Sequence, residues 1–122
     1  GRSSGIIYRC ETSVHITTAP GARPAVHIGG IAGQLSGNGI LDGCVSYGVL
    51  TGDLSNTGGI AGSMAIEYTL DPEDDVTGHL SNIYRKQYEY KSIIQKCVNT
   101  GDVSGKRSYV GGIVGRMDLG AI

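Results

Sequence analysis

The sequence predicts an all-β fold, a β-solenoid of three stacked coils of about 29 residues each, and three observations support this prediction. A five-residue segment, Gly-Gly-Ile-Ala-Gly or Gly-Gly-Ile-Val-Gly, occurs at residues 29–33, 58–62 and 111–115. The second copy follows Cys44 at the same spacing at which the third copy follows Cys97. Between these landmarks, short apolar runs alternate with glycines, which is typical of strands and tight turns. We call the five-residue segment the glycine phrase.

The composition favours thin layers over a large globular core. The chain has 122 residues, of which 21 are Gly, far above the average usage of about 7%. It contains no Phe or Trp, so 7 Tyr supply all the aromatic side chains. With 10 basic and 11 acidic residues, no basic field is present that would attract nucleic acid. No apolar run approaches the roughly 18 residues of a membrane span, so we expect no membrane insertion in this segment.

The first predicted unit covers residues 6–35, and its glycine phrase lies farther from Cys10 than the other two phrases lie from their cysteines. The extra stretch is Pro20 to Pro24. The second unit covers residues 40–64 and the third covers residues 93–117. Between them we place a 24-residue insertion at residues 65–88. The whole chain is therefore predicted to be one repeat domain whose units differ in their loops.

Alignment of the three units on their cysteines predicts six ladders of equivalent apolar residues, which we expect to line the core. Three of them form the core prediction: Cys10, Cys44 and Cys97; Ile6, Ile40 and Ile93; Ile31, Ile60 and Ile113. The others are Ile7, Leu41 and Ile94; Ile16, Leu50 and Val103; Leu35, Met64 and Met117. The cysteines are expected to be inward-facing free thiols, because their number is odd and a bridge between stacked strands is strained. An antiparallel hairpin within each unit is the alternative architecture.

The two ends of the chain fall inside the repeat. Continuing the 29-residue period beyond Cys97 places Ile122 at the position of Ile93. We therefore expect the chain to be a slice of a longer array, or its open ends to stack on other copies, since unpaired strand edges invite association.

The repeat resembles the GLUG motif of bacterial surface and secreted proteins, among them adhesin-like proteins and some immunoglobulin-A-specific metallopeptidases. The third unit matches best, at Ile93, Cys97, Asn99, Gly101, Val103, Gly105 and residues 110–115. The second unit has Ser46 in place of the Asn, and the first departs at Thr12, Val14 and Thr18. The resemblance implies an extracellular or cell-surface module of a bacterium and no catalytic residues. The His-Glu-x-x-His signature of the metallopeptidase relatives is absent.

The insertion is the most distinctive stretch and the predicted binding surface. It is acidic at first and then basic and aromatic. Clustered tyrosines beside Arg and Lys suit contact with a protein or a glycan, because Tyr offers a large area at low entropic cost. The candidate residues are Tyr68, Tyr84, Arg85, Lys86, Tyr88 and Tyr90. The alternative interpretation is that the insertion folds back as a cover for the side of the solenoid.

Other chemistry has little support in the sequence. Asp71, Glu73 and Asp75 alternate like the start of a calcium loop, but Val76 and Asn82 stand where an EF-hand needs Gly and Glu. A solvated acidic loop is the favoured interpretation, and a weak calcium site is the alternative. The cysteines lack the local pairs of a metal site, and none of the three histidines stands at ligand spacing. We expect no cofactor, no other metal and no catalytic site.

Two functions follow as expectations. The first is a non-catalytic structural or adhesive repeat module of a bacterial extracellular or cell-surface protein, with any binding through the tyrosine-rich insertion. Its partner would be a protein or a glycan. The second is a self-assembling subunit that stacks end to end into a filament.

Overall fold

The computed structural model describes residues 1–18, 27–53, 56–65, 92–106 and 108–122, and all regular elements within them are β-strands. The first coil contains β2 (Ile6–Tyr8), β3 (Glu11–Thr12), β4 (Ile16–Thr17), β5 (Ile28–Gly29) and β6 (Ala32–Ser36). The second contains β7 (Ile40–Asp42), β8 (Val45–Ser46), β9 (Leu50–Gly52), β10 (Thr57–Gly58) and β11 (Ala61–Ala65). The third contains β12 (Ile93–Gln95), β13 (Val98–Asn99), β14 (Val103–Gly105), β15 (Val110–Gly111) and β16 (Val114–Met117). One further strand, β1 (Arg2–Ser3), precedes the first coil.

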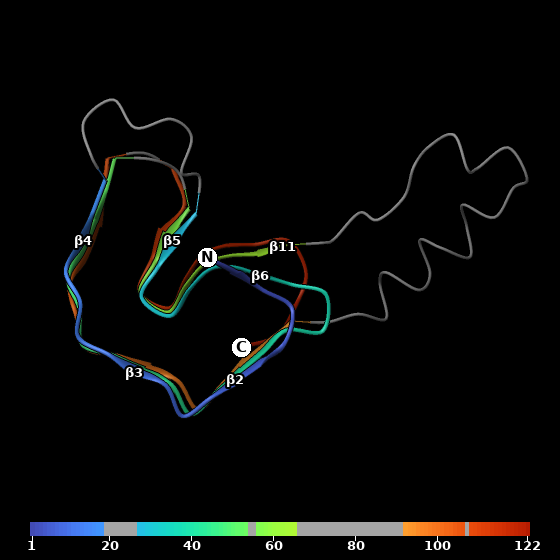
Figure 1. Cartoon of the computed structure of the whole chain (residues 1–122). Helices are drawn as coiled ribbons and strands as arrows, with labels where there is room; N and C mark the ends of the chain where they lie inside the picture. The colour runs from blue at the N-terminus through green and yellow to red at the C-terminus, as the bar shows by residue number, and fades with distance from the viewer. Residues whose placement is uncertain (19–26, 54–55, 66–91, 107) are drawn as a thin grey trace, which may run out of the picture.

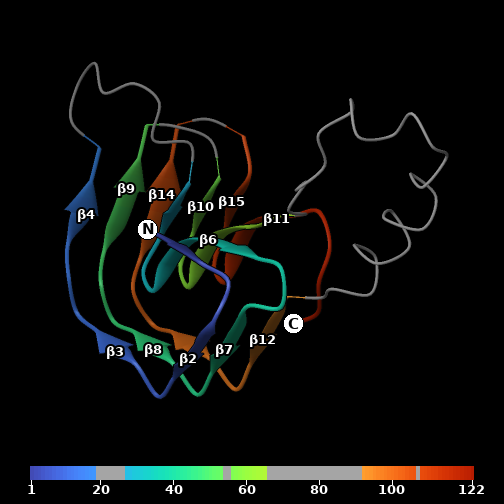
Figure 2. The ribbon, with the colours of Figure 1, turned by 45° about the vertical axis from the view of Figure 1, so that its right-hand side comes forward.

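Equivalent strands of successive coils pair in parallel, so the predicted β-solenoid is confirmed. The five sheets have the orders β1-β6-β11-β16, β2-β7-β12, β3-β8-β13, β4-β9-β14 and β5-β10-β15. Seen along the stack, the three coils superimpose (Figure 1), and after a turn they lie side by side (Figure 2). Each coil thus satisfies its backbone groups from its neighbours, and the antiparallel alternative is wrong.

The register of the sheets is the one that the cysteine alignment predicts. Leu41 pairs with Ile7 on one side and with Ile94 on the other. Leu50 pairs with Ile16 and with Val103 in the same way. The long insertion leaves this register unchanged, because Ala65 before it still pairs with Ser36 and Ile93 after it still pairs with Ile40. Ala65, the first residue of the predicted insertion, therefore belongs to β11.

The main core lies between the β6-β11 and β7-β12 strands. Its fully buried residues include Leu35, Leu41, Cys44, Ile60 and Met64. Ile31, Ile113 and Cys97 pack against this cluster and are half-buried. A second buried group lies on the other side of the solenoid and includes Ile28, Leu50 and Thr57. Cys44 and Ile60 thus occupy the interior, as the ladder interpretation predicts.

The ladder of Ile6, Ile40 and Ile93 is not part of the core, which corrects the sequence-based expectation. Successive side chains of a strand point to opposite faces, so two consecutive apolar residues cannot both point inward. Ile7, Leu41 and Ile94 occupy the inner positions, and Ile6 is 72% exposed. Cys10 is exposed as well, because the first coil is covered by a neighbour on one side only.

The glycine phrase is the corner between the fourth and fifth strands of each coil, where the chain folds inward (Figure 1). A Cβ on Gly58 would meet the carbonyl oxygen of Ala61 and the amide nitrogen of Gly115. A Cβ on Gly59 would meet the carbonyl oxygen of Gly112 and the side chain of Asn99. The missing side chains therefore allow a sharp bend and bring the corner against the β8-β13 strands. The phrase therefore packs the coils closely against one another.

The chain begins a fourth coil one residue earlier than predicted. Ala121, and not Ile122, bridges to Ile93. The turn that follows Met117 is one residue shorter than the turn after Leu35, which shifts the phase. Ile122 itself is 68% exposed.

Candidate functional site

All residues of the predicted binding surface lie outside the described residues. They are Tyr68, Tyr84, Arg85, Lys86, Tyr88 and Tyr90, together with the calcium candidates Asp71, Glu73 and Asp75. The structure describes the residues on either side of this segment: Ala65 ends β11, and Ser92 precedes β12. In the first coil the same corner is a short turn in which Gly39 N–H donates to Ser36 O over 3.0 Å. The insertion thus stands at the place in the repeat where the first coil has a tight turn.

The loop around Pro20 and Pro24 also lies outside the described residues, but its flanks mark a second corner. It joins β4 to β5, whereas the long insertion joins β11 to β12. The two insertions therefore leave the solenoid at different corners of its cross-section.

A polar row that the sequence reasoning missed lies at the corner between the third and fourth strands of each coil. It consists of His27, Asn56 and Tyr109, each at the second position before a glycine phrase. Ile28 N–H donates to Asn56 O over 3.0 Å, and Thr57 N–H donates to Tyr109 O over 3.0 Å, which stacks the three residues in order. Asn56 Nδ2 lies 3.1 Å from His27 Nδ1. In the sequence, only the constant spacing of these residues from the glycine phrase marks the row, because the residue types differ.

Charged side chains surround this row. The Arg116 guanidinium lies over the Tyr109 ring, 5.5 Å from its centroid, and Arg116 Nε donates to Asp118 Oδ1 over 2.8 Å. Burial lowers the pKa of His27, Arg116 lowers it further, and Asp118 acts in the opposite direction. His27 is therefore neutral near pH 7 and accepts a hydrogen bond from the Asn56 amide. Asn56 is buried, whereas Tyr109 is 55% exposed, so the row can present the phenol of Tyr109 and the guanidinium of Arg116 to a polar partner.

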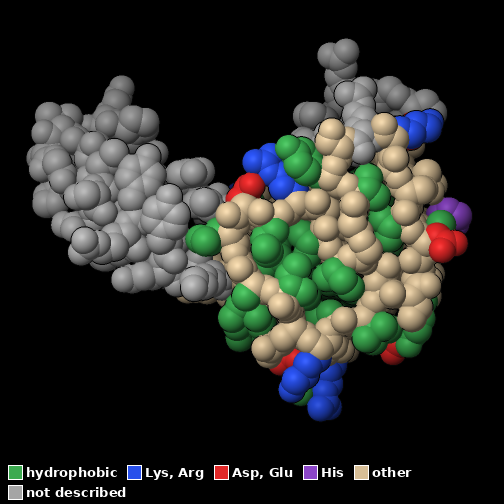
Figure 3. Space-filling view, turned by 180° about the vertical axis from the view of Figure 1, so that it is seen from behind, with side chains coloured by type: hydrophobic (Ala, Val, Ile, Leu, Met, Phe, Trp, Pro, Cys, Tyr) green, Lys and Arg blue, Asp and Glu red, His purple; other side chains and the backbone are tan. Residues whose placement is uncertain are grey.

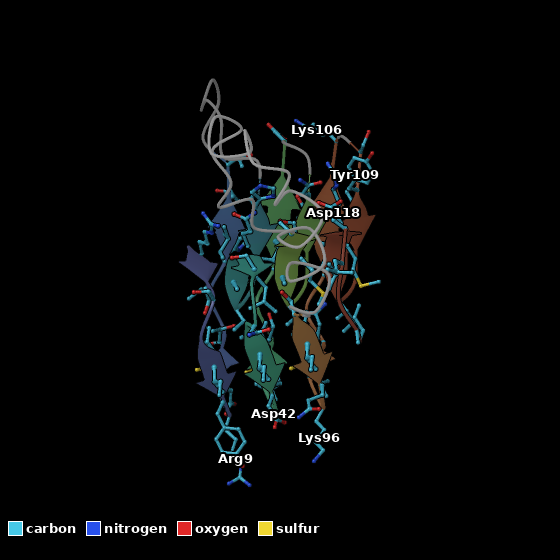
Figure 4. The ribbon with its side chains drawn as sticks, turned by 90° about the vertical axis from the view of Figure 1, so that its right-hand side faces the viewer. Arg9, Asp42, Lys96, Lys106, Tyr109 and Asp118 are labelled. Atoms are coloured by element: carbon cyan, nitrogen blue, oxygen red, sulfur yellow. The ribbon has the colours of Figure 1, made fainter. Side chains whose placement is uncertain are left out.

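A second charged corner follows the first strand of each coil. Arg9, Asp42 and Lys96 point away from the solenoid there, opposite Lys106, Tyr109 and Asp118 (Figure 4). Arg9 and Lys96 have positive φ values of 51° and 53°, and Gly43 has 67° at the equivalent position. Gln95 Nε2 donates to Asp42 Oδ2 over 3.0 Å. Opposite charges alternate along this corner, so it forms no strong field of one sign.

The end of the solenoid formed by the third coil is apolar. Figure 3 shows hydrophobic side chains gathered at this end. Val98, Val110, Met117 and Ile122 are between 41% and 68% exposed there. A flat apolar surface beside strand edges suits contact with a further layer of strands.

A metal ion would need several His, Cys, Asp or Glu side chains close together. Among the described residues no group of three or more such side chains could hold a metal ion. The three cysteines stack one per coil, and burial raises the pKa of the Cys44 thiol. The described part of the chain also has no helix that could span a lipid bilayer.

No protein-family model, curated protein or solved structure matches this chain.

Proposed function

We propose that the chain is a non-catalytic structural and adhesive repeat module of a bacterial extracellular or cell-surface protein. The observation that supports this most is the unchanged register of the coils on the two sides of residues 66–91, the range that holds most of the predicted insertion. A scaffold that tolerates a long insertion at one corner without losing its stacking can carry binding segments. The resemblance to GLUG repeats supports the location outside the cell.

The scaffold suits this role because its stiffness comes from repeated backbone pairing. Every described strand of the second coil pairs with a strand on each side. Opening one coil therefore exposes two rows of unpaired N–H and C=O groups, which makes the stack cooperative. A rigid support reduces the entropy that an attached binding segment loses when it meets a partner.

The tyrosine-rich insertion is the proposed contact segment, and its partner class is a protein or a glycan. Its composition supports this proposal, since Tyr and Arg are enriched at the energetic centres of interfaces. The polar row of His27, Asn56 and Tyr109 lies at a different corner, next to the flank of the Pro20 loop.

The structure suggests a defined excision variant as the test. Residues 66–91 are replaced by Gly-Asn, the pair that joins Ser36 to Gly39 in the first coil. The matched control deletes residues 20–24, the other insertion. Both variants and the full chain are applied to arrays of glycans and extracellular-matrix proteins. We expect the excision to abolish binding and the control to retain it, with unchanged far-ultraviolet circular dichroism in both. Equal binding by the full chain and the excision variant would make the insertion scaffold only.

Self-assembly into a filament remains the second candidate, because the third coil has an exposed apolar end. The strand order argues against direct end-to-end stacking of the described coils, however. Direct stacking of a first coil on a third coil would place β1 of one copy where β16 of the next lies, since both occupy the same sheet. Ala121 of one copy would likewise meet β2 of the other. Light scattering over a range of concentrations tests the candidate, and a mass that stays at one chain would exclude it.

A further inference from the structure

Two rows of polar side chains run next to each other along the solenoid, one on each side of the glycine phrase. The first is the row of His27, Asn56 and Tyr109. The second follows each phrase directly and pairs in register, and it consists of Gln34, Ser63 and Arg116. A Cβ on the last glycine of each phrase would meet the carbonyl oxygen of the first-row residue in its own coil. The two rows are therefore neighbours in all three coils.

The second coil contributes a buried polar atom from each row. Asn56 is 3% exposed and Ser63 is 1% exposed. The Nδ2 atom of Asn56 contacts His27 of the first coil, so the amide oxygen points away from that coil. Neither this oxygen nor Ser63 Oγ has a hydrogen-bond partner among the residues that the structure describes. Buried polar atoms without partners are costly in a fold, so this pair favours a place for a hydrogen-bonding ligand.

The third coil adds exposed groups beside these two atoms. Tyr109 follows Asn56 in its row, and Arg116 is the in-register partner of Ser63. Tyr109 is 55% exposed, and the side chains of Arg116 and Asp118 are 47% and 34% exposed. Figure 4 shows Tyr109 and Asp118 together at this end. Since β15 and β16 are the outer strands of their sheets, a rotamer change of Tyr109 or Arg116 would open a route to the buried pair.

The backbone at Tyr109 indicates that its ring serves a purpose other than folding. Tyr109 has a φ of 64°, and Asn56 has a φ of 61° at the equivalent position. Asn adopts this left-handed conformation readily, whereas a bulky side chain adopts it only at a cost. An Asn would thus suit the fold at this position better than the Tyr does. Strained residues of this kind cluster at sites that hold ligands.

The charges beside the ring favour a neutral ligand. Arg116 and Asp118 form an ion pair, with Arg116 Nε donating to Asp118 Oδ1 over 2.8 Å. A bound anion would be repelled by Asp118 and a bound cation by Arg116. A ligand that suits both the Tyr109 ring and the polar atoms has one apolar face and several hydroxyl groups. A neutral hexose has this chemistry, because its C–H groups form an apolar face and its hydroxyls donate and accept hydrogen bonds.

We propose that this corner of the third coil binds a neutral hexose unit of a glycan. The sugar stacks on the Tyr109 ring, and its hydroxyl groups donate to Asn56 Oδ1 and to the Asp118 carboxylate. Ser63 Oγ and the Arg116 guanidinium complete the site as donors to hydroxyl oxygens. The inference goes beyond the contact segment proposed above, because no residue of 66–91 takes part in it.

Methyl hexosides are the probes for the test. The full isotope-labelled chain is titrated with methyl glucoside, methyl galactoside and methyl mannoside, and nuclear magnetic resonance follows the amide signals. We expect at least one probe to cause saturable shifts at Asn56, Ser63 and Tyr109, and none at Asp42 on the opposite side. Methyl glucuronide, which carries a negative charge, should bind more weakly. The absence of a saturable shift with all three hexosides, or tighter binding of the glucuronide than of any hexoside, would overturn the proposal.

Two exposed tyrosines supply the matched variants. Tyr109→Asn should weaken hexoside binding about tenfold or more, and its urea midpoint should not fall, since Asn56 holds the same backbone conformation. Tyr8→Asn is the control, because Tyr8 is 57% exposed and its ring centroid lies 4.9 Å from the guanidinium of Arg9. The control should bind as the wild-type chain does.

The outcomes of this comparison separate the possible failures. Wild-type affinity in Tyr109→Asn would contradict the proposal, as would an equal loss in both tyrosine variants. The variant in which residues 66–91 are excised should keep the hexoside shifts. A failure of this site is therefore distinguishable from a failure of the insertion as a contact segment.

Discussion

Alanine substitution at equivalent glycines of two phrases tests whether the stability of the chain depends on local packing or only on the position in the repeat. Gly59 and Gly112 occupy the same place in the second and third phrases. A Cβ on Gly59 would overlap the Gly112 carbonyl oxygen and the Asn99 side chain. A Cβ on Gly112 would meet nothing within 4 Å. The repeat alone predicts equal effects, and the structure predicts opposite ones.

The magnitudes follow from these contacts. One obstacle at Gly59 is a backbone atom of the next coil, so Gly59→Ala should cost about 1–3 kcal/mol, as overpacking does in other cores. Neither glycine has a positive φ. Gly112→Ala should therefore stabilise the chain by about 0.4–1 kcal/mol, because alanine has fewer conformations in the unfolded state.

Urea unfolding followed by far-ultraviolet circular dichroism measures both variants beside the wild-type chain. We expect the midpoint of Gly59→Ala to fall and that of Gly112→Ala to stay or rise. Equal losses in the two variants would refute the packing account of the phrase. A loss for Gly112→Ala alone would refute the order of the coils.

Three further predictions follow from named contacts. Leu41→Ala should lower the free energy of unfolding by about 2–5 kcal/mol, since Leu41 is 0% exposed. Ile6→Ala should change it by less than about 0.5 kcal/mol, since Ile6 is 72% exposed, and thermal unfolding compares the two variants. Arg9→Gly should stabilise the chain by about 1 kcal/mol, because it relieves a φ of 51°, and an unchanged or lower urea midpoint would contradict that reasoning. His27 has a pKa below its ordinary 6.5 in the fold, so the unfolded chain binds the proton first. The contribution of His27 to the free energy of unfolding should therefore be constant above pH 6.5 and should fall as the pH drops from 6.5 toward the lower pKa of the folded chain. His27→Gln should remove this part of the pH dependence.

The fold could be predicted from the sequence because the same pattern occurs in three units, so that each unit supports the interpretation of the other two. Alignment on the cysteines predicts which residues of the three units are equivalent, and these residues pair in the sheets. The same alignment leaves both parallel coils and antiparallel hairpins possible, and the structure decides for the coils. The spacing does not show which of two consecutive apolar residues points inward. Ile6 and Ile7 look alike in the sequence, and their difference comes from the direction of the strand as it leaves the preceding corner.

The candidate site was less accessible to sequence reasoning. The row of His27, Asn56 and Tyr109 shares a position and no residue type, so composition and motif searches pass over it. The phase of the fourth coil was missed for a different reason. A turn can lose one residue, as the one before Ala121 does, while the strands beside it keep their pairing.

The central claim is that the chain forms parallel coils paired one above another, and couplings across hydrogen bonds test it most directly. Nuclear magnetic resonance detects such couplings between an amide nitrogen and the carbon of the carbonyl group whose oxygen accepts the hydrogen bond. The account predicts couplings from Tyr47 N–H to Thr12 C=O, a bond of 2.8 Å, and from Thr100 N–H to Ser46 C=O, a bond of 2.9 Å. Each joins equivalent places in neighbouring coils. Couplings confined to residues of a single unit, as an antiparallel hairpin requires, would contradict the account.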